Sequence, residues 1–555
     1  MKPVLFSFLF ILLTFTTSAQ ALGEQKKTFT RADTLRGSLR PERTCFDVNY
    51  YELNIKVDTG EHSISGSNKI VFKAMNNFRV MQIDLFENMN IIQIISEGKE
   101  LKYKREFNAV FVYFENEVPS GSTREITVYY QGKPIVAKRP PWDGGFTWTY
   151  DNNGKVWVGV SCEGMGASSW WPMKDHLSDE PDSMRIICTV PSGLQCISNG
   201  VEENVNMRGD NTTTFHWKVS YPINSYNVTL NIGDYVHFAD QYVAADGEKL
   251  DLDYYVLSYN LEKAQQQFKQ VKPMMSCYEK YLGKYPFWND GYALVETPYL
   301  GMEHQGAIAY GNKYLTGYAG RDFSRIGLDF DYIIIHESGH EWWGNSVSCK
   351  DIADMWIHEG FCTYSEAIYV ECLFGKDTAM RYINAKKTSV GNKNPVVGIY
   401  GVNEEGDGDM YAKGMLMLNT IRHIINKDGL WWSIVKGISD TAFKYKTTDY
   451  QEITNYISKK SGINLAPVFE QYLKQANIPV LEYKLKKTKH GEYELSYRWQ
   501  VDVKNFRMPF VISYSAGQEK RINGSDEWQT TSIKLKKDTQ LKVNDELMYI
   551  DVKKL

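Results

Sequence analysis

The chain has 555 residues, which at roughly 150 residues per domain is enough for about three or four domains. Hydrophobic residues make up 43% and charged residues 23%, as in folded globular proteins, so extensive disorder and a multi-span membrane protein are excluded. The 63 Lys and Arg residues almost balance the 67 Asp and Glu residues, and the net charge is -4. Nucleic acid is therefore not expected as a partner, because binding to phosphates needs clustered positive charge.

The first 21 residues have the three parts of an export signal. Lys2 precedes an apolar run from Val4 to Leu13, and the segment ends in small residues at Ala19-Gln20-Ala21. The alternative, a membrane anchor, is disfavoured because this run is too short to cross about 30 Å of hydrocarbon as a helix. No later stretch has about 18 uninterrupted apolar residues. We therefore expect cleavage of residues 1–21 and a secreted or periplasmic protein with no integral membrane span.

Export would place the cysteines in an oxidising compartment, where an even number permits disulfides without fixing their pairing. The eight cysteines are Cys45, Cys162, Cys188, Cys196, Cys277, Cys349, Cys362 and Cys372. Cys188 and Cys196 flank the turn Pro191-Ser192-Gly193 and could face each other across a hairpin, which makes them the first pair to test. Buried free thiols are the equal alternative.

Residues 22–237 are predicted to form an N-terminal antiparallel β domain. Apolar and polar residues alternate in runs separated by Gly, Asn, Asp and Pro, which is the pattern of half-buried strands. The runs include Tyr51–Val57, Ile126–Tyr130, Phe215–Val219 and Tyr226–Ile232.

Residues 238–476 are predicted to form a mainly helical domain, and residues 477–555 a short C-terminal β-sandwich. From about residue 261 the apolar spacing becomes helical, with Phe268, Val271, Met275 and Tyr278 on one stripe. Alternation returns between Tyr493 and Val503. The sequence therefore predicts a multidomain α+β protein.

The strongest chemical signal is the H-E-x-x-H segment His336-Glu337-Ser338-Gly339-His340. Residues four apart share a helix face, so His336 and His340 can both direct a ring nitrogen at one Zn²⁺. Glu337 would then lie beside a metal-bound water, whose pKa falls towards ~7, and would remove its proton during attack on a carbonyl.

A catalytic zinc site normally has three protein ligands, and Glu359 is predicted to be the third. It lies 19 residues after His340, near the start of a second predicted helix. Glu366 is seven residues further, on the same helix face, and would either orient a ligand or be an exposed carboxylate. Cys362 could be a fourth ligand, but a thiolate there would displace the water, so this reading is disfavoured.

The H-E-x-x-H motif followed by Glu359 and then by Gly360-Phe361-Cys362-Thr363-Tyr364-Ser365-Glu366 resembles the zinc aminopeptidases of peptidase family M1, which are gluzincins such as aminopeptidase N and leukotriene hydrolase. The likeness runs from about Phe46 to Pro479. It implies one Zn²⁺ per chain and a thermolysin-like catalytic domain after the β domain. The large helical C-terminal domain of longer family members is absent, because only the short β region follows.

The resemblance also implies roles for residues outside the zinc motif. Leu300-Gly301-Met302-Glu303-His304 is similar to the family's G-x-M-E-N segment, an edge strand in which Gly301 and Met302 would align the peptide and Glu303 would bind its α-ammonium. Glu163 matches the glutamate of the family's Q-x-E segment, a second ammonium ligand. Tyr411 matches the tyrosine of Y-x-K-G and would donate a hydrogen bond to the oxyanion.

Three positions depart from the family pattern. Ser161 stands where Gln is usual, and His304 and His358 stand where Asn is usual. None of these changes removes a metal ligand or the general base, so we expect them to affect substrate preference more than the reaction catalysed. The two histidines are either titrating groups near the substrate amine or neutral residues in the wall of the site. The segment Trp142–Trp148 has no recognised counterpart and is either local packing or a cleft loop.

The sequence thus predicts a secreted zinc aminopeptidase that acts on peptides with a free N-terminus. His336, His340 and Glu359 would hold the metal, and Glu337 and Tyr411 would be catalytic. Three alternatives stay open: a zinc endopeptidase, an epoxide hydrolase of related fold, and a catalytically inactive zinc-binding protein.

Overall fold

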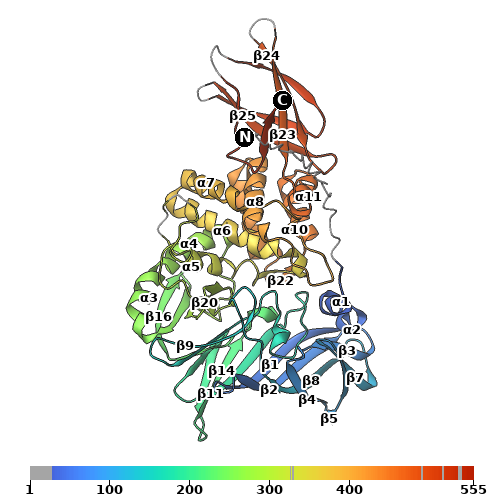
Figure 1. Cartoon of the computed structure of the whole chain (residues 1–555), viewed down its shortest axis with the longest axis vertical. Helices are drawn as coiled ribbons and strands as arrows, with labels where there is room; N and C mark the ends of the chain where they lie inside the picture. Colours follow the sequence, from blue (N-terminus) through green and yellow to red (C-terminus); the bar gives the residue numbers. More distant parts are fainter. Residues whose placement is uncertain (1–27, 325–326, 328–329, 489–491, 516–517, 536–539) are drawn as a thin grey trace, which may run out of the picture.

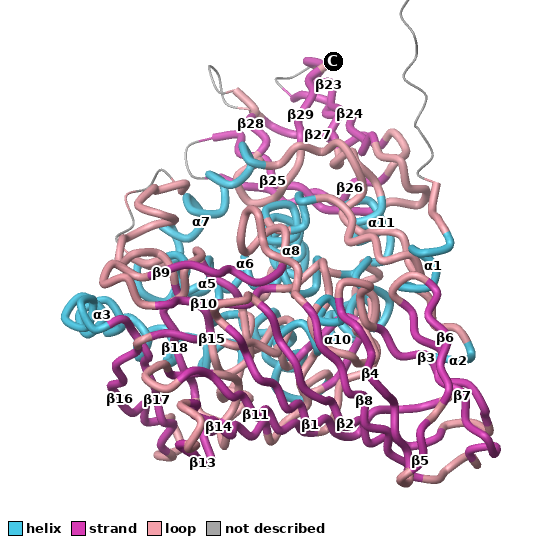
Figure 2. Tube along the Cα trace, turned by 60° about the horizontal axis from the view of Figure 1, so that its bottom comes forward, coloured by secondary structure: helices cyan, strands magenta, loops and turns pink. Residues whose placement is uncertain are grey.

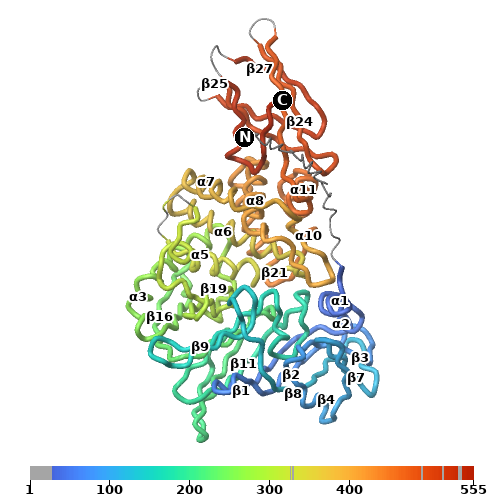
Figure 3. Tube along the Cα trace, viewed as in Figure 1, coloured from blue at the N-terminus to red at the C-terminus, as the bar shows by residue number. Residues whose placement is uncertain are grey.

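The computed structural model describes residues 28–324, 327, 330–488, 492–515, 518–535 and 540–555, and the predicted export signal lies outside these ranges. Three regions follow one another along the longest axis of the molecule (Figure 1). Strands of the N-terminal region lie at one end, helices lie in the middle and strands of the C-terminal region lie at the other end, in the order of the sequence (Figure 3). No helix in these ranges is long and apolar enough to cross a membrane.

The N-terminal region is a β domain, as predicted, and the strands of its largest sheet lie side by side in Figure 2. In order across this sheet they are β13 (Val201–Met207), β14 (Thr212–Val219), β11 (Ser183–Pro191), β1 (Phe46–Asp58), β2 (Ser63–Ala74), β8 (Thr123–Gly132), β4 (Met89–Ser96) and β5 (Lys99–Glu100). A second sheet has the order β3 (Phe78–Asp84), β7 (Ala109–Val118) and β6 (Lys102–Glu106). A third has the order β12 (Gln195–Ile197), β15 (Asn231–Gly233), β10 (Val156–Ser161) and β9 (Gly145–Tyr150). Two short helices precede them, α1 (Arg31–Gly37) and α2 (Pro41–Thr44).

The β domain differs from the prediction in one strand pair. β1 and β11 run parallel, with Tyr50 opposite Ser183, whereas their other neighbours are antiparallel. Parallel neighbours need a long connection, and here the chain forms β2 to β10, which include the whole second sheet and half of the third, before β11 returns beside β1.

The predicted strand at Tyr226–Ile232 is also different. Ser225–Asn227 form a 3-10 turn, and only the short β15 follows. Asn224 caps the turn because its side chain accepts a hydrogen bond from the backbone N–H of Asn227. The alternating apolar residues of this run are therefore buried by loop packing rather than by a long strand.

The middle region is mainly helical, but a mixed sheet opens it. The strand order is β16 (Tyr235–Val243), β17 (Lys249–Leu257), β18 (Tyr292–Glu296), β20 (Ile308–Tyr310) and β19 (Gly301–Met302), and β21 (Val347–Cys349) pairs with β22 (Lys446–Thr448). The helices are α3 (Leu261–Gln267), α4 (Val271–Leu282), α5 (Tyr332–Gly339), α6 (Trp356–Phe374), α7 (Lys376–Ala385), α8 (Ala412–Ile425), α9 (Asp428–Gly437), α10 (Tyr450–Ser461) and α11 (Ala466–Lys474). The domain limit predicted after residue 237 falls inside β16, and the domain limits stay a prediction.

A disulfide joins α4 to α6 through Cys277 and Cys372. Cys188 and Cys196 are not linked: both are buried free thiols, which is the second of the two alternatives, although the two side chains lie close enough to interact. The reason is that Cys188 lies on β11 and Cys196 on β12, which belong to different sheets, so the turn between them does not close a hairpin.

The C-terminal region contains two facing sheets, as predicted for a sandwich. One has the order β27 (Gln529–Lys534), β24 (Glu492–Gln500), β23 (Val480–Lys487) and β29 (Asp551–Lys554), and the other β26 (Gln518–Ser525), β25 (Arg507–Ser515) and β28 (Lys542–Val543). Leu495, Tyr497 and Trp499 alternate into the interior, where the Tyr497 and Phe510 rings pack edge to face at 5.1 Å. This interior is continuous with that of the helices, so the region is anchored on them.

Two glycines let α6 and α8 cross at close range. A Cβ atom added at Gly414 on α8 would lie 2.7 Å from the Cα atom of Gly360 on α6, which is closer than packed atoms approach. This crossing brings the residue that precedes α8, Tyr411, next to the α6 residue Glu359.

We predict that Gly414→Ala lowers the unfolding temperature, with a stability cost of about 1–3 kcal/mol, because the added methyl group meets backbone that cannot move aside. Gly429→Ala is the matched control, since Gly429 lies in α9 with nothing within 4 Å of an added Cβ atom. The control should raise the unfolding temperature through helix propensity. Equal unfolding temperatures of the two variants would contradict the close crossing.

Candidate metal centre and active site

One cleft of about 930 Å³ lies between the β domain and the helices. It is lined by all nine residues that the sequence predicts for the site: Glu163, Gly301, Met302, Glu303, His336, Glu337, His340, Glu359 and Tyr411. Residues separated by up to about half the chain are thus brought to one place, and Glu163 comes from the β domain while the others come from the middle region.

The helix that carries the H-E-x-x-H motif is held firmly at its start. Asp331 is the N-cap of α5, and its side chain accepts hydrogen bonds from the backbone N–H groups of Ile333 and Ile334. Tyr310 and Asn312 donate to the same carboxylate at 2.7 and 2.8 Å. The first turn is therefore fixed relative to the mixed sheet.

The two motif histidines are held with their Nε2 atoms free to bind a metal. The Nδ1 atom of His336 donates to Glu366 at 2.7 Å, and the Nδ1 atom of His340 donates to the Trp343 carbonyl at 2.9 Å. A neutral imidazole has one proton, so both Nε2 atoms carry lone pairs. These two atoms lie 3.3 Å apart.

Glu359 completes a triangle of donor atoms. Its Oε2 atom lies 3.5 Å from the Nε2 atom of each histidine, and it is buried with no hydrogen-bond partner among the described residues. Four donors at about 2.0–2.2 Å from a tetrahedral zinc ion would be separated by about 3.3–3.6 Å. The spacing, the free lone pairs and the unpartnered buried oxygen fit zinc.

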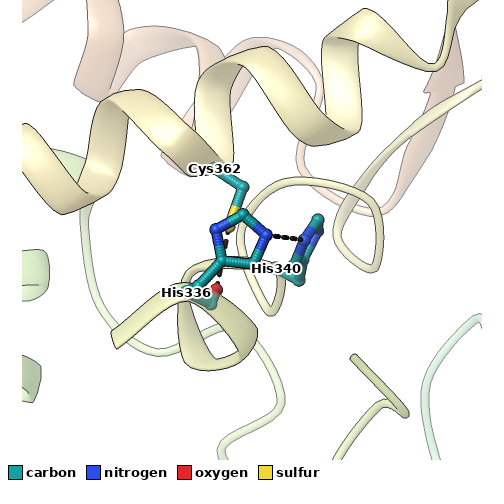
Figure 4. A group of neighbouring side chains, drawn as sticks. All are labelled: His336, His340 and Cys362. Carbon is teal, nitrogen blue, oxygen red and sulfur yellow. Dashed lines mark hydrogen bonds between the residues drawn. The ribbon is translucent and has the colours of Figure 1, made fainter. Parts of the chain in front are cut away.

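Cys362 lies next to the two histidines but does not belong to this triangle. Figure 4 shows its sulfur behind the His336 ring, where it donates a hydrogen bond to the backbone carbonyl of His336 at 2.8 Å. The thiol thus has another partner, although its sulfur lies within 4.8 Å of a ring nitrogen of each histidine. That it leaves the fourth metal position to water stays a prediction.

Glu366 orients His336. Of the two interpretations of the sequence, a residue that orients a metal ligand and an exposed carboxylate, the structure supports the first. It is fully buried, and one carboxylate oxygen accepts the Nδ1 proton of His336. Tyr382 donates to the other oxygen, and Lys386 lies 3.6 Å away. A carboxylate behind a histidine ligand fixes its tautomer and makes its other nitrogen a better donor.

Glu337 lies in the cleft beside the donor triangle, and burial raises the pKa of its carboxyl to about 7. A carboxyl with a pKa near neutrality can accept a proton and return it. Gly301 leaves room for it, since a Cβ atom at Gly301 would lie 2.6 Å from a Glu337 carboxylate oxygen.

The segment Gly301–Met302 is an edge strand, as the resemblance implies. β19 pairs with β20 on one side only, with Gly301 opposite Tyr310. Glu303 follows directly, and its carboxylate oxygen lies within 4.8 Å of the donor atoms of His340 and Glu359. An extended peptide could therefore pair with the open edge and reach the donor triangle.

Glu163 and Glu303 place two carboxylates in one part of the cleft. Desolvation in the cleft, followed by the negative charge of Glu303, raises the pKa of Glu163. Burial likewise raises the pKa of Glu303. A cationic group between the two carboxylates would stabilise their charged forms.

Tyr411 lines the same cleft as Glu337, with its ring stacked on the His336 ring at 6.2 Å. Although the residue as a whole is 36% exposed, desolvation of the hydroxyl and the nearby charges of Glu359 and Glu163 raise its pKa. The hydroxyl therefore keeps its proton and can act as a hydrogen-bond donor.

The departures from the family pattern lie in the wall behind the cleft. Ser161 is buried, with no partner for its hydroxyl among the described residues. Burial lowers the pKa of His304 and of His358 to about 3, so both are neutral. His358 has hydrogen-bond partners at both ring nitrogens, whereas neither nitrogen of His304 has one in the described part of the chain.

The segment Trp142–Trp148 agrees with both interpretations of the sequence, a cleft loop and local packing. Trp142 is 69% exposed and lines the cleft, so it is part of a cleft loop. Trp148 packs locally, stacked on Phe146 at 5.3 Å and on His62 at 4.8 Å.

Sequence reasoning missed two residues of the site. Arg36 of α1 lines the cleft and donates to the backbone carbonyl of Met165, next to the loop that carries Glu163. Tyr226 donates to Glu303 at 3.0 Å. No local pattern marked either residue, since both act on segments more than 70 residues away.

The chain matches two family models. The peptidase M1 N-terminal domain matches residues 47–227, and the peptidase family M1 domain matches residues 264–472. The chain therefore belongs to peptidase family M1, whose metal is zinc, in agreement with the donor set.

The relatives are distant. A probable aminopeptidase 1 of Saccharolobus solfataricus is 21% identical over 71% of this chain and 49% of its own length, and a leucyl aminopeptidase of the same organism is 22% identical over 78% and 54%. This chain thus spans about half the length of these relatives. An M1 zinc metallopeptidase from Deinococcus radiodurans, solved with a Tyr-Ser-Ala substrate, has the same fold, with a TM-score of 0.65 at 18% identity over 78% of this chain and 95% of its own.

We predict that Glu366→Gln weakens zinc binding about 10- to 100-fold, because the amide no longer holds the His336 tautomer as a carboxylate does. Zinc content after titration with a chelator measures the effect, and the unchanged protein should hold one zinc per chain. Glu296→Gln is the control, since Glu296 is a buried carboxylate with several donors but lies outside the cleft lining. Equal zinc affinities of the two variants would exclude the role of Glu366.

Proposed function

We propose that the chain is an exported zinc aminopeptidase that removes the N-terminal residue from peptides. The observation that carries this proposal is the position of Glu303, whose carboxylate lies within 4.8 Å of donor atoms of His340 and Glu359. The α-ammonium nitrogen and the first carbonyl carbon of a peptide are about 2.5 Å apart. A peptide held at Glu303 by its ammonium group would therefore bring its first carbonyl, and no later one, to the metal centre.

The two carboxylates account for the choice of a free N-terminus. An ammonium group between Glu303 and Glu163 gains charge-assisted hydrogen bonds and offsets the desolvation and the repulsion from Glu303 that raise the pKa of Glu163. A blocked N-terminus or an internal peptide bond would leave the carboxylates unpaired in a desolvated cleft, which is costly. An endopeptidase has no use for this arrangement.

The residues around the donor triangle would divide the work of hydrolysis. Zinc held by His336, His340 and Glu359 supplies Lewis acidity, which lowers the pKa of a bound water and polarises a carbonyl. Glu337 would accept the proton of the attacking water at its carboxylate oxygen. It would then donate this proton to the leaving amine nitrogen. The Tyr411 hydroxyl would donate a hydrogen bond to the oxyanion.

Relatives support the proposal. Two archaeal proteins similar to this chain are named a probable aminopeptidase and a leucyl aminopeptidase, and the Deinococcus radiodurans enzyme was solved with a tripeptide substrate. This chain covers 95% of that enzyme's length, so the two share nearly the whole of that enzyme's fold.

We predict that the purified zinc-loaded chain hydrolyses aminoacyl arylamides with a free amine and not their N-acetylated twins, by a factor of about 100 or more in kcat/KM, because the acetyl group removes the charge that Glu303 and Glu163 bind. A chelator should abolish turnover, and zinc should restore it. Cleavage of the blocked twin at the same rate would favour an endopeptidase.

Glu337→Gln is the control for contaminating peptidases. It should keep the zinc and lower kcat by about 100-fold or more, because the amide cannot accept a proton. Turnover that is unchanged in this variant would mean that hydrolysis does not come from this site.

Export is the second part of the proposal. It is supported by the signal pattern of residues 1–21 and by the disulfide between Cys277 and Cys372, since disulfides persist in oxidising compartments.

We predict that protein recovered from the medium or periplasm of its own cells begins after Ala21 and that denaturation without reductant exposes the six free cysteines to alkylation, while Cys277 and Cys372 stay linked. Intact mass and N-terminal sequencing measure both. A chain that keeps residues 1–21 and stays in the cytoplasm would overturn the export proposal and leave the peptidase proposal standing.

A further inference from the structure

Three successive buried hydrogen bonds lead to the carboxylate of Glu303. The backbone N–H of Cys349 donates to the Nε2 atom of His358 at 2.8 Å. The Nδ1 atom of His358 lies 3.3 Å from the Tyr226 hydroxyl, and that hydroxyl lies 3.0 Å from the Oε1 atom of Glu303. The side chains of His358, Tyr226 and Glu303 are at most 4% exposed, so water does not compete for these bonds.

Each group in this series of hydrogen bonds can act towards its neighbour only as a donor or only as an acceptor. A backbone N–H can only donate, so the Nε2 atom of His358 must be the acceptor. The proton of the neutral ring is then on Nδ1, which donates to the Tyr226 oxygen. Tyr226 has a single hydroxyl proton and Glu303 carboxylate can only accept, so that proton points at Glu303. The reverse arrangement would place two N–H groups against each other at Cys349.

The backbone of Glu303 is held by a parallel set of contacts. Asn345 donates to the Glu303 carbonyl at 2.8 Å, and Asn227, the neighbour of Tyr226, donates to Asn345 at 2.6 Å. Main chain and side chain of Glu303 are thus both fixed from the turn Ser225–Asn227 of the β domain.

We propose that Tyr226 and His358 are positioning residues that hold the Glu303 carboxylate in one rotamer for the α-ammonium group of the substrate. This inference rests on the proposed aminopeptidase function. With one oxygen bonded to the Tyr226 hydroxyl, the carboxylate cannot rotate away from the cleft without losing a buried hydrogen bond. His358 acts on Glu303 only through Tyr226, because it fixes the direction in which the Tyr226 hydroxyl donates its proton.

The proposal also explains why a histidine can stand at position 358. The imidazole ring has nitrogens at two edges, so it can span from the Cys349 backbone to the Tyr226 hydroxyl and set the proton order of both bonds. It thereby takes part in substrate recognition although it is fully buried and is separated from the cleft by Tyr226 and Glu303.

The test uses the full zinc-loaded chain and a free-amine aminoacyl arylamide. Tyr226→Phe should raise KM about 10-fold and leave kcat within about 2-fold, because it removes ammonium binding and not the metal chemistry. His358→Ala should change KM in the same direction by a smaller factor, since the Tyr226 hydroxyl can still reach Glu303 but is free to rotate.

Tyr235→Phe is the matched control. Tyr235 is as buried as Tyr226, and its hydroxyl also accepts one hydrogen bond, from Trp157 at 3.0 Å, and donates one, to the Glu296 carbonyl at 2.9 Å. Neither of these partners lines the cleft, whereas Glu303, the partner of Tyr226, does, so loss of the Tyr235 hydroxyl should lower stability without changing KM.

A pair of competitive inhibitors separates positioning from general damage. Leucinamide carries the ammonium group, and its des-amino twin, 4-methylpentanamide, lacks it. Tyr226→Phe should weaken inhibition by leucinamide about 10-fold and leave the twin unchanged. Equal weakening of both inhibitors, or an unchanged KM in both Tyr226→Phe and His358→Ala, would overturn the inference while the peptidase function stands. If the unchanged chain fails to hydrolyse free-amine substrates, the proposed function fails and this inference falls with it.

Discussion

The close packing of α5 against α6 is the constraint on which the metal centre depends. The two histidines come from the end of α5 and Glu359 from the start of α6, so the donor triangle exists only while the two helices keep their distance. Gly339 makes this distance short, since a Cβ atom there would lie 3.0 Å from the Cys362 sulfur. That sulfur donates to the His336 carbonyl, and the rings of Trp343 and Phe361 stack at 4.4 Å. A buried thiol in this place therefore serves the site as a packing residue.

The recognition half of the cleft depends on a different contact, between the β domain and the middle region. Asparagine side chains carry it: Asn224 donates to the Gly344 carbonyl at 2.9 Å, and Asn227 donates to Asn345, which in turn donates to the Glu303 carbonyl. Each of these polar groups is buried, and losing a partner would leave an unsatisfied group at a cost of about 1–3 kcal/mol. The backbone at Glu303 is thus fixed by the β domain, and the edge strand before it by β20, which holds the Glu303 carboxylate in place beside the donor triangle.

The parts that the sequence predicted well are those set by short-range spacing. Histidines four residues apart come together because the helix backbone requires it, and Glu359 and Glu366 share a face of α6 for the same reason. The β regions at both ends follow from alternation, which reports burial directly. The family resemblance added Glu303, Glu163 and Tyr411, and the fold brings all of them to one cleft, although their roles stay predictions.

The features that escaped prediction all join segments far apart in the chain. Cys277 and Cys372 are 95 residues apart and lie on separate helices, so no turn between them signalled the disulfide. Tyr226 is 77 residues from Glu303 and 132 from His358, and its alternating neighbours pointed to a strand where the chain forms a turn. Sequence motifs contain the residues that contact the substrate. The groups that orient those residues come from other segments, which the fold packs against the motif. The role of a departure such as His358 can therefore be inferred only when the segment that contacts it, here the one with Tyr226, is known.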